Sequence, residues 1–579
     1  MVKFTGHTIT PDSALGGTQI QRSLRFNSGA SQYITRTCSS EGNRVKWTWS
    51  GWVKKTRNGR TSYALLSSDN GGDGGGNNGI ASIYFHNSGE IHTYYDTPSG
   101  DNYGAINSNV YRDTTSWYHI VWQVDAANST SKIWVNGVEQ SIASGSQPVS
   151  GYNYTMNQSG KRMAIGVDAW DIYTFSDTYI AETHYSDGQL YAASDFGYTD
   201  AQTGQWRPKN GNEIKSNITY GTNGFWLDFR DATSTTTLGY DYSGNGNHWT
   251  LVNMSVANNS NVSFTSDTPT NNFCTLNFLD TYGDGVSEEL RFGNLQAKNT
   301  SSSYRTTRST VHVKTGKWYY EATVIAAGSN FLVGVAGPDY VAGSGARRAY
   351  NINGQKYGQD GFGYSYGNTY TTNDVIGVAI DLDAGTLTFY KNGTSQGVAF
   401  TDLLTYLSGI GWTPIFNGNS NSHAAFNFGQ RPFSYTPPTG HRALSGHNLA
   451  TVNAAAVVRP QRFFETLLYS GTGSSQNITG LEFQPDFVWV KKRSGNDSHD
   501  LQDSVRGATK RLESNNTNSE STVAGSISSF NSSGFTVVNA GTTNENGNTY
   551  VAWCWKGGGS SSTYNIDGTG HATASSAGS

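Results

Sequence analysis

Charged residues are scarce in this chain of 579 residues. Asp, Glu, Lys and Arg together make up 14% of the sequence, the net charge is −4, and no Lys/Arg block stands out. A nucleic-acid-binding protein needs a basic footprint that neutralises phosphates, so this composition predicts no nucleic-acid partner. No apolar run approaches the length of a membrane span, which predicts no membrane insertion.

Cysteine is also scarce, and a secretion signal is missing. Cys38, Cys274 and Cys554 lie far apart without a metal-type spacing, and MVKFTGHTITPDSALGG at the start has no apolar signal-peptide segment. Secreted all-β proteins often carry disulfides. We therefore expect a protein that is not secreted by a signal peptide but folds in the cytoplasm and is exposed later, as a virion component is.

Strand-forming and turn-forming residues are abundant instead. Aromatic residues are 13% of the chain and there are 69 glycines. Segments such as KWTWSGWVKK and WYHIVWQVD carry the aromatic and β-branched residues of strands, and turn signals recur about every ten residues. The pattern predicts an all-β protein of tandem antiparallel β-sandwiches, followed by a smaller C-terminal β module.

The expected organisation follows from these segments and from the changes in composition between them. Seven parts are expected: an N-terminal arm at 1–20, a sandwich at 21–200, a β-rich joint at 201–290, a sandwich at 291–436, a linker at 437–460, a small sandwich at 461–556 and a Gly/Ser-rich tail at 557–579.

Two of these parts resemble known families. The ordered phrases GWVKK, WYHIVWQVD, SKIWVNGV, AIGV and YIAETHYSDGQL resemble the concanavalin A-like, laminin G-type jelly roll. The phrases GKWYYE, DVIGVAIDLDAGTLTFYKNG and FNFG resemble the SPRY domain, which is also a concanavalin-like sandwich. The whole chain resembles phage virion surface proteins with these domains. That resemblance implies two related sandwiches and a role in binding.

One phrase occurs in both sandwiches, as VDAANSTSKIWVNG and IDLDAGTLTFYKNG. Asp125 and Asp381 each end one strand, a polar turn follows, and the next strand ends at Asn136-Gly137 or Asn392-Gly393. Asn-Gly tolerates the positive φ of a tight turn. We interpret the repeat as a scaffold hairpin and not as a repeated ligand site.

Ligand-binding candidates are aromatic and basic residues in the first sandwich and in the long loop after residue 337. Consecutive tyrosines on a strand point one ring outward, and exposed rings beside Asp suit a sugar. Long polar loops are often functional. The candidates are Tyr94, Tyr95, Trp170, Asp171, Tyr173, Arg347, Arg348, Tyr350 and Tyr357. For the strand aromatics the alternative is core packing, and for the loop it is contact with a neighbouring chain.

Calcium is the one cofactor that the sequence suggests, and no cofactor is certain. Asp69, Asp73 and Asn77 in a glycine-rich loop offer oxygen ligands of the kind that Ca²⁺ prefers. The alternative, which the glycine content favours, is that this loop is a mobile tip. The stretch DTYGDG resembles a calcium loop but places Tyr282 where an oxygen ligand belongs.

Catalytic motifs are lacking, so we expect no enzyme. A retaining glycanase needs two carboxylates about 5 Å apart, and no Glu-x-Asp-x-Glu run supplies them. The sequence has no His-x-x-x-His, Gly-x-Ser-x-Gly or phosphate-loop motif.

The sequence as a whole leads us to expect a phage virion protein on the particle surface, as a tail fibre, tailspike or capsid fibre. It would be assembled in the host cytoplasm, form a homo-oligomer (a trimer) with other virion proteins as partners, and bind host-surface glycan or protein through sandwich loops. The alternatives are an assembly or decoration protein that binds only virion proteins, and a polysaccharide depolymerase.

Overall fold

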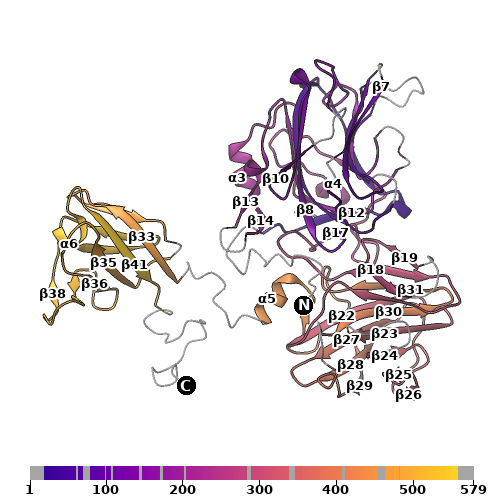
Figure 1. Ribbon diagram of the computed structural model, residues 1–579. Coiled ribbons are helices and arrows are strands. Elements are labelled where there is room, and N and C mark those ends of the chain that lie inside the picture. The colour runs from indigo at the N-terminus through magenta and orange to yellow at the C-terminus, as the bar shows by residue number, and fades with distance from the viewer. Residues whose placement is uncertain are drawn as a thin grey trace. The chain divides into compact units, whose positions relative to one another are not determined.

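The computed structural model describes residues 19–59, 63–69, 79–97, 100–105, 109–141, 147–169, 172, 174–200, 204–282, 288–337, 346–406, 411–452, 463–481 and 483–557. The expected N-terminal arm and C-terminal tail lie almost entirely outside this part of the chain. The chain divides into two compact units, residues 1–453 and 454–579. It is an all-β protein of tandem antiparallel sandwiches, as the composition predicts (Figure 1). None of the helices in the described ranges is long and apolar enough to cross a membrane.

The first sandwich packs two sheets face to face around an apolar core (Figure 1). One sheet has the order β10 (Val138–Gln140), β9 (Thr130–Val135), β8 (Trp117–Asp125), β3 (Lys46–Lys55), β12 (Thr178–Asp187), β1 (Ser23–Arg25) and β17 (Phe264–Thr265), with β15 (Phe225–Leu227) also paired to β12. The other has the order β16 (Thr250–Val252), β2 (Tyr33–Thr37), β11 (Arg162–Ile165), β4 (Tyr63–Ser68), β5 (Ala81–Phe85), β6 (Ile91–Thr97) and β7 (Gly100–Ala105). Short elements complete it: β13 (Gly197–Thr199), β14 (Trp206–Pro208), α2 (Ala193–Phe196), α3 (Gly211–Asn217) and α4 (Thr235–Leu238).

The second sandwich, in the same compact unit, has its own apolar core. One sheet has the order β18 (Leu276–Tyr282), β21 (Arg305–Ser309), β30 (Thr413–Asn419), β23 (Asn330–Ala336), β24 (Arg347–Asn351), β25 (Gln355–Tyr357) and β26 (Gly363–Ser365). The other has the order β19 (Glu288–Arg291), β20 (Gln296–Asn299), β31 (Ser422–Asn427), β22 (Lys317–Ala326), β27 (Val375–Asp381), β28 (Thr386–Lys391) and β29 (Thr394–Phe400).

The repeated phrase forms a hairpin in both sandwiches, as the sequence predicts. β8 pairs with β9, and β27 pairs with β28. Asn136 and Asn392 have φ of 49° and 48°, and the glycine after each also has positive φ. The side-chain oxygen of each Asn accepts a hydrogen bond from a backbone N–H in the first strand of its hairpin, His119 in β8 and Val375 in β27, at 2.8 Å in both.

The hairpin aspartates also occupy equivalent positions. Asp125 lies opposite Lys46 on the neighbouring strand β3, and Asp381 lies opposite Lys317 on β22. The ion pairs measure 3.6 Å and 2.9 Å between nitrogen and oxygen. A shared register of this kind makes the two Asp residues parts of the sheet and leaves ligand binding to other elements.

Residues 201–290, expected as a joint, contribute strands to both sandwiches. β15, β16 and β17 join the first, and β18 joins the second. The segment is held by buried polar contacts: the Lys54 ammonium lies 2.8 Å from Asp267 Oδ2 and 2.7 Å from Asn272 Oδ1. Tyr179 donates its hydroxyl to the Gly293 carbonyl at 2.7 Å. These bonds connect the two sandwiches, and the alternating pattern of single strands does not reveal them.

Part of the expected linker at 437–460 is also ordered on the second sandwich. β32 (Arg442–Ala443) pairs in parallel with β22, and α5 (Gly446–Val452) follows it. Leu444 is buried in the second core and Leu449 packs against that core. The apolar residues of HRALSGHNLA therefore anchor this stretch, and the boundary between the two compact units falls at 453/454.

The second compact unit is a smaller β module. Its main sheet has the order β33 (Phe464–Ser470), β41 (Thr549–Trp555), β35 (Phe487–Lys492) and β36 (Asp500–Asp503). A second sheet has the order β34 (Gln476–Thr479), β40 (Gly534–Val537) and β39 (Ile527–Asn531). β37 (Lys510–Arg511) pairs with β38 (Ser521–Thr522), and α6 (Gly541–Asn544) precedes the last strand.

Candidate functional site

A pocket of about 520 Å³ opens in the second sandwich, where β24 and β25 approach β29 and the turn at 401–406. The residues that line it combine two cations, two carboxylates and three aromatic rings: Arg348, Lys356, Gly358, Gln359, Asp360, Tyr364, Phe400, Asp402 and Tyr406. Its volume is in the range of small-ligand and side-chain pockets.

Arg348 forms the floor of this pocket. Its side chain is 3% exposed, and its Nε and Nη2 donate to the two oxygens of Asp402 at 2.9 Å and 2.6 Å. The guanidinium also lies 4.7 Å from the ring centre of Tyr406 and 5.4 Å from that of Phe400. Hydrogen bonds from Arg348 lower the pKa of Asp402. This planar, doubly bonded pair holds the turn at 401–406 against β24.

Lys356 and Asp360 supply the remaining charges. Lys356 Nζ donates to the Ala399 carbonyl at 2.6 Å and lies 5.2 Å from the Phe400 ring centre. Asp360 accepts the Tyr364 hydroxyl at 2.7 Å, and this bond is the main reason that its pKa is lowered. Since two cations face two carboxylates, the lining is close to neutral and does not select a strongly charged ligand.

Large apolar side chains are exposed on the segments that form the pocket. The exposed fractions are 69% for Phe362, 51% for Tyr364, 54% for Val398, 50% for Leu404 and 36% for Tyr406. Exposed apolar side chains gathered around a polar pocket are typical of protein interaction sites.

The sequence-predicted residues of this region divide into three groups. Arg348 lines the pocket. Arg347 and Tyr357 are half-buried and form a cation–π pair, with 5.5 Å from the guanidinium carbon to the ring centre. Tyr350 is a correction, because it is fully buried in the core, with its hydroxyl donated to the Asn368 carbonyl. Asp402 and Tyr406 were missed because they are more than fifty residues from Arg348 in the sequence.

The aromatic candidates of the first sandwich also need a correction. Tyr95 is fully buried and bonds Ser131 Oγ at 2.7 Å, so it serves the core. Tyr94 is the half-buried member of the pair, as strand alternation requires. Trp170, Asp171 and Tyr173 lie outside the described residues.

The calcium candidates show a similar division. Asp69 is buried, and its carboxylate pairs with the Arg162 guanidinium at 2.9 Å. That pairing supplies the carboxylate with a charge partner from the protein itself. Asp73 and Asn77 lie outside the described residues. In DTYGDG, Asp280 pairs with Arg308 at 2.9 Å, and residues 283–287 lie outside the described part.

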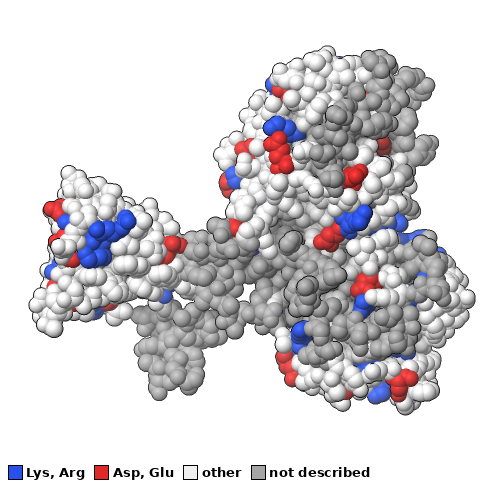
Figure 2. Space-filling view, in the orientation of Figure 1, with Lys and Arg blue, Asp and Glu red and all other residues white. Residues whose placement is uncertain are grey.

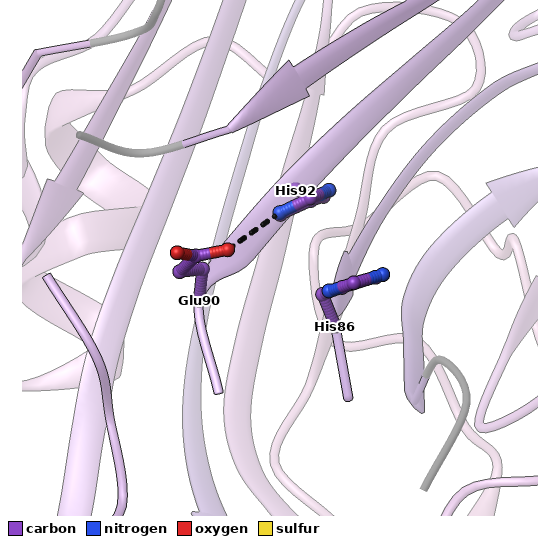
Figure 3. Close-up of side chains that lie close together, drawn as sticks. All are labelled: His86, Glu90 and His92. Carbon is purple, nitrogen blue, oxygen red and sulfur yellow. Dashed lines mark hydrogen bonds and ion pairs between the residues drawn. The ribbon is translucent and has the colours of Figure 1, made fainter. Parts of the chain in front are cut away.

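His86, Glu90 and His92, which were not predicted from the sequence, form a cluster on the β5–β6 hairpin. The potential ligand atoms of these three side chains lie within 4.8 Å of one another. His92 Nε2 is 3.1 Å from Glu90 Oε2, and the two imidazole rings stack with centres 4.4 Å apart (Figure 3). Burial lowers the pKa of His92, and the His92 contact is the main cause of a lowered pKa at Glu90. The sequence signal for this cluster is the segment YFHNSGEIH, in which apolar and polar residues alternate on both sides of a tight turn.

The second compact unit exposes one face of its main sheet. Phe464, Trp555 and Phe487 stand side by side on β33, β41 and β35, with successive ring centres 4.9 Å and 5.2 Å apart. Trp553 and Trp489 form the next row, 5.5 Å apart. Phe464 and Leu468 are exposed on this face.

Charge is sparse over the surface of the molecule. Figure 2 shows a mostly uncharged described surface on the face in view, with Lys and Arg in small groups among Asp and Glu. Because charge is sparse, shape and apolar contact have to supply most of the binding energy at the sites above.

The three cysteines are free and buried, and burial raises the pKa of the Cys38 thiol to about 11.

Comparison with known proteins assigns three regions. Residues 28–194 match the concanavalin A-like lectin/glucanases superfamily, residues 317–431 match the SPRY domain, and residues 459–578 match a domain of unknown function, DUF7483. Concanavalin A-like and SPRY domains are thus present in that order, as the resemblance predicted. Together with the fold, they define a tandem β-sandwich protein whose domains suggest binding or protein-interaction roles.

The curated relatives match about a quarter of this chain. The E3 ubiquitin-protein ligase RKP of Arabidopsis thaliana is 30% identical over 146 residues, which are 24% of this chain and 11% of that protein. Ran-binding protein 9 of Xenopus tropicalis is 30% identical over 161 residues, 25% of this chain and 29% of that protein. The chain thus spans less than a third of the length of either relative. Both are eukaryotic proteins.

The solved structures that match part of this chain include SPRY domains and a pentraxin. A human SPRY domain has 17% sequence identity and a TM-score of 0.21, with 25% of this chain and 97% of that chain covered. The native heptameric SAP-like pentraxin of Limulus polyphemus has 13% identity and a TM-score of 0.24, with 30% and 80% covered.

Proposed function

We propose that this protein is an adhesion protein that binds a polypeptide on a target surface through the pocket of its SPRY domain. The observation that carries the proposal is the pocket built on the Arg348–Asp402 pair and flanked by exposed Phe362, Tyr364 and Tyr406. A polypeptide offers both the apolar side chains that these rings bury and the backbone groups that the polar lining can bond. Aromatic residues at the centre of a contact dominate protein–protein affinity.

The location that we propose is the surface of a phage virion, as part of a tail fibre, tailspike or capsid fibre. Support for it comes from the sequence, in the resemblance of the modules and the small number of cysteines. The eukaryotic relatives share only part of their length with this chain, so they do not bear on the location. A homo-oligomer, proposed as a trimer, would add avidity to weak individual sites.

The test uses the full chain against a displayed random-peptide library. An enriched peptide is measured for affinity against the wild type, a Tyr364→Ala/Tyr406→Ala variant and a Tyr304→Ala control. Tyr304 lies in the same sandwich, outside the pocket lining, and is 44% exposed. We expect the double variant to lose at least about tenfold in affinity, because truncating a central aromatic costs more than about 1 kcal/mol. Equal affinities for the double variant and the control would refute the pocket as the binding site.

Two further measurements separate the alternatives. A glycan array with a parallel assay for released reducing sugar distinguishes glycan adhesion from polysaccharide cleavage. Imaging of particles with a labelled chain tests the proposed location, since a position inside the capsid would contradict it.

A second candidate is an assembly protein that binds only other virion proteins. The exposed aromatic face of β33, β41 and β35 favours it, because a flat apolar sheet face fits the surface of a neighbouring protein. Loss of particle incorporation in a Phe464→Ser/Leu468→Ser variant, with peptide binding retained, would favour this role over adhesion.

A further inference from the structure

We propose that the β5–β6 hairpin of the first sandwich binds one divalent transition-metal ion of the Zn²⁺ class through His86, Glu90 and His92. This site is independent of the SPRY pocket and extends the proposed function.

The hairpin presents the three side chains on one side of the sheet. Phe85 and Ile91 are a backbone pair and are fully buried in the core. Strand side chains alternate, so His86 and His92 face away from that core. The backbone bond from His86 N–H to the Glu90 carbonyl, 2.8 Å, closes the turn between them. The buried pair Phe85 and Ile91 thus fixes the hairpin that carries the three proposed metal-binding side chains.

The separations are close to those of a bound metal. Zn²⁺ with bonds of 2.0–2.1 Å in a tetrahedral site places its ligand atoms about 3.3 Å apart. His92 Nε2 and Glu90 Oε2 are already 3.1 Å apart, and all three potential ligand atoms lie within 4.8 Å. Binding of one ion by all three residues requires the His86 ring to rotate out of its stack on His92. Figure 3 shows the His86 ring beside that of His92 and the hydrogen bond between His92 and Glu90.

A neighbouring hydroxyl orients two of the ligands. Ser88 Oγ lies 2.7 Å from His86 Nδ1 and donates to Glu90 Oε2 at 2.9 Å. Bonds of this kind, made by a group next to the ligands, fix ring and carboxylate orientation in metal sites.

The ligand set selects the class of metal. Two imidazole nitrogens and one carboxylate oxygen suit Zn²⁺ and its transition-metal neighbours, whereas Ca²⁺ and Mg²⁺ prefer sets made of oxygen. Three protein ligands leave a position for water or for a donor from a bound partner. The alternative is a hydrogen-bonded cluster that binds no ion, and it predicts no stoichiometric uptake.

The experiment titrates Zn²⁺ into the untagged full chain after chelator treatment, by calorimetry. We expect one ion per chain, at least tenfold weaker binding for His86→Ala/His92→Ala, and no displacement by millimolar Ca²⁺. A His441→Ala/His499→Ala variant controls for the loss of two half-buried histidines elsewhere. Zn²⁺ should also raise the thermal midpoint of the wild type and of this control, but not that of the His86/His92 variant.

Three outcomes would overturn the proposal: no stoichiometric binding to the wild type, equal affinity in the His86/His92 variant, or displacement of Zn²⁺ by Ca²⁺. The metal-free thermal midpoint of each variant shows that it folds. If the double variant fails to fold, Glu90→Gln, which retains both rings, provides the same comparison.

Discussion

At the scale of single residues, Arg348 shows how one side chain builds a pocket. Its guanidinium is almost fully buried and contacts Asp402 and the rings of Phe400 and Tyr406. A buried cation is costly unless it is paired and hydrogen-bonded. The pair therefore fixes the turn at 401–406 and leaves the exposed edge of Tyr406 available for a ligand.

The Arg348–Asp402 pair predicts a pH dependence. Because the bonds from Arg348 lower the pKa of Asp402, the pair stabilises the fold above the unfolded pKa of about 3.9 and loses this effect as pH falls through the lower folded value. The Asp402 side chain is solvent-accessible, so the effect is about 1 kcal/mol. We expect the stability difference between wild type and Asp402→Asn to shrink between about pH 4 and pH 2. Urea unfolding at a series of pH values measures it, and a pH-independent difference would contradict the prediction.

The hairpin glycines predict a second effect at this scale. Gly393 has φ of +80°, and an added Cβ would lie 2.5 Å from the Tyr435 ring. We expect Gly393→Ala to lower the free energy of unfolding by about 2–3 kcal/mol, because left-handed backbone strain and overpacking act together. Gly361 has φ of +77° with open space around it, so Gly361→Ala isolates the strain, about 1 kcal/mol. Denaturant unfolding measures the stability of both variants. An equal loss of stability in the two would exclude the contact with the Tyr435 ring as a cause.

At the scale of elements, hairpins both hold the sheets and carry the sites. The hairpins β8–β9 and β27–β28 share turn geometry and ion-pair register, whereas the hairpins β5–β6 and β24–β25 carry the metal cluster and pocket residues. All four hairpins lie one strand in from an edge of their sheets. The two pairs of hairpins therefore differ in the side chains that they carry and not in their distance from a sheet edge.

The segment between the sandwiches predicts a large effect from one buried ion pair. Lys54 and Asp267 are each 1% exposed, so Asp267→Asn leaves an uncompensated buried ammonium and should cost about 3–5 kcal/mol. Lys132 and Glu139 form an exposed pair, and Glu139→Gln should cost less than about 1 kcal/mol. Urea midpoints of the two variants test this. A small loss for Asp267→Asn would show that Asn272 alone satisfies the ammonium.

At the scale of the whole molecule, two compact units share one chain. The first joins two sandwiches through buried bonds such as Tyr179 to Gly293, and the second has its own core of Val488, Val490 and Phe535. Binding sites on separate units can act together, because linkage raises the effective concentration of the second contact.

This division predicts the unfolding behaviour of the full chain. Calorimetry should show one transition for residues 1–453 and another that coincides with that of an isolated 454–579 fragment, because each unit has its own core. Asp267→Asn should lower only the first transition. A single cooperative transition for the full chain would show that the units stabilise each other.

The sequence predicted most of the fold but fewer of the residues that form the candidate sites. Alternation and Asn-Gly turns are local, so the sandwiches and repeated hairpins followed from the sequence. Tyr95 and Tyr350 were assigned to ligands because alternation alone does not say which face of a strand meets the other sheet. Asp402 was missed because it reaches Arg348 only after the sandwich closes. The His86, Glu90 and His92 cluster is local but was not predicted, because His-x-x-x-His is a helical spacing and these residues meet across a hairpin turn.

The sequence by itself determined the all-β class, the order of the domains and the turns that close the hairpins, because these depend on residues close together in the chain. Tertiary structure decided which aromatic rings enter the cores, that residues 201–290 complete both sandwiches, and which distant side chains form the pocket. Those outcomes depend on burial and on contacts between strands far apart in the chain, which the spacing of residues does not encode.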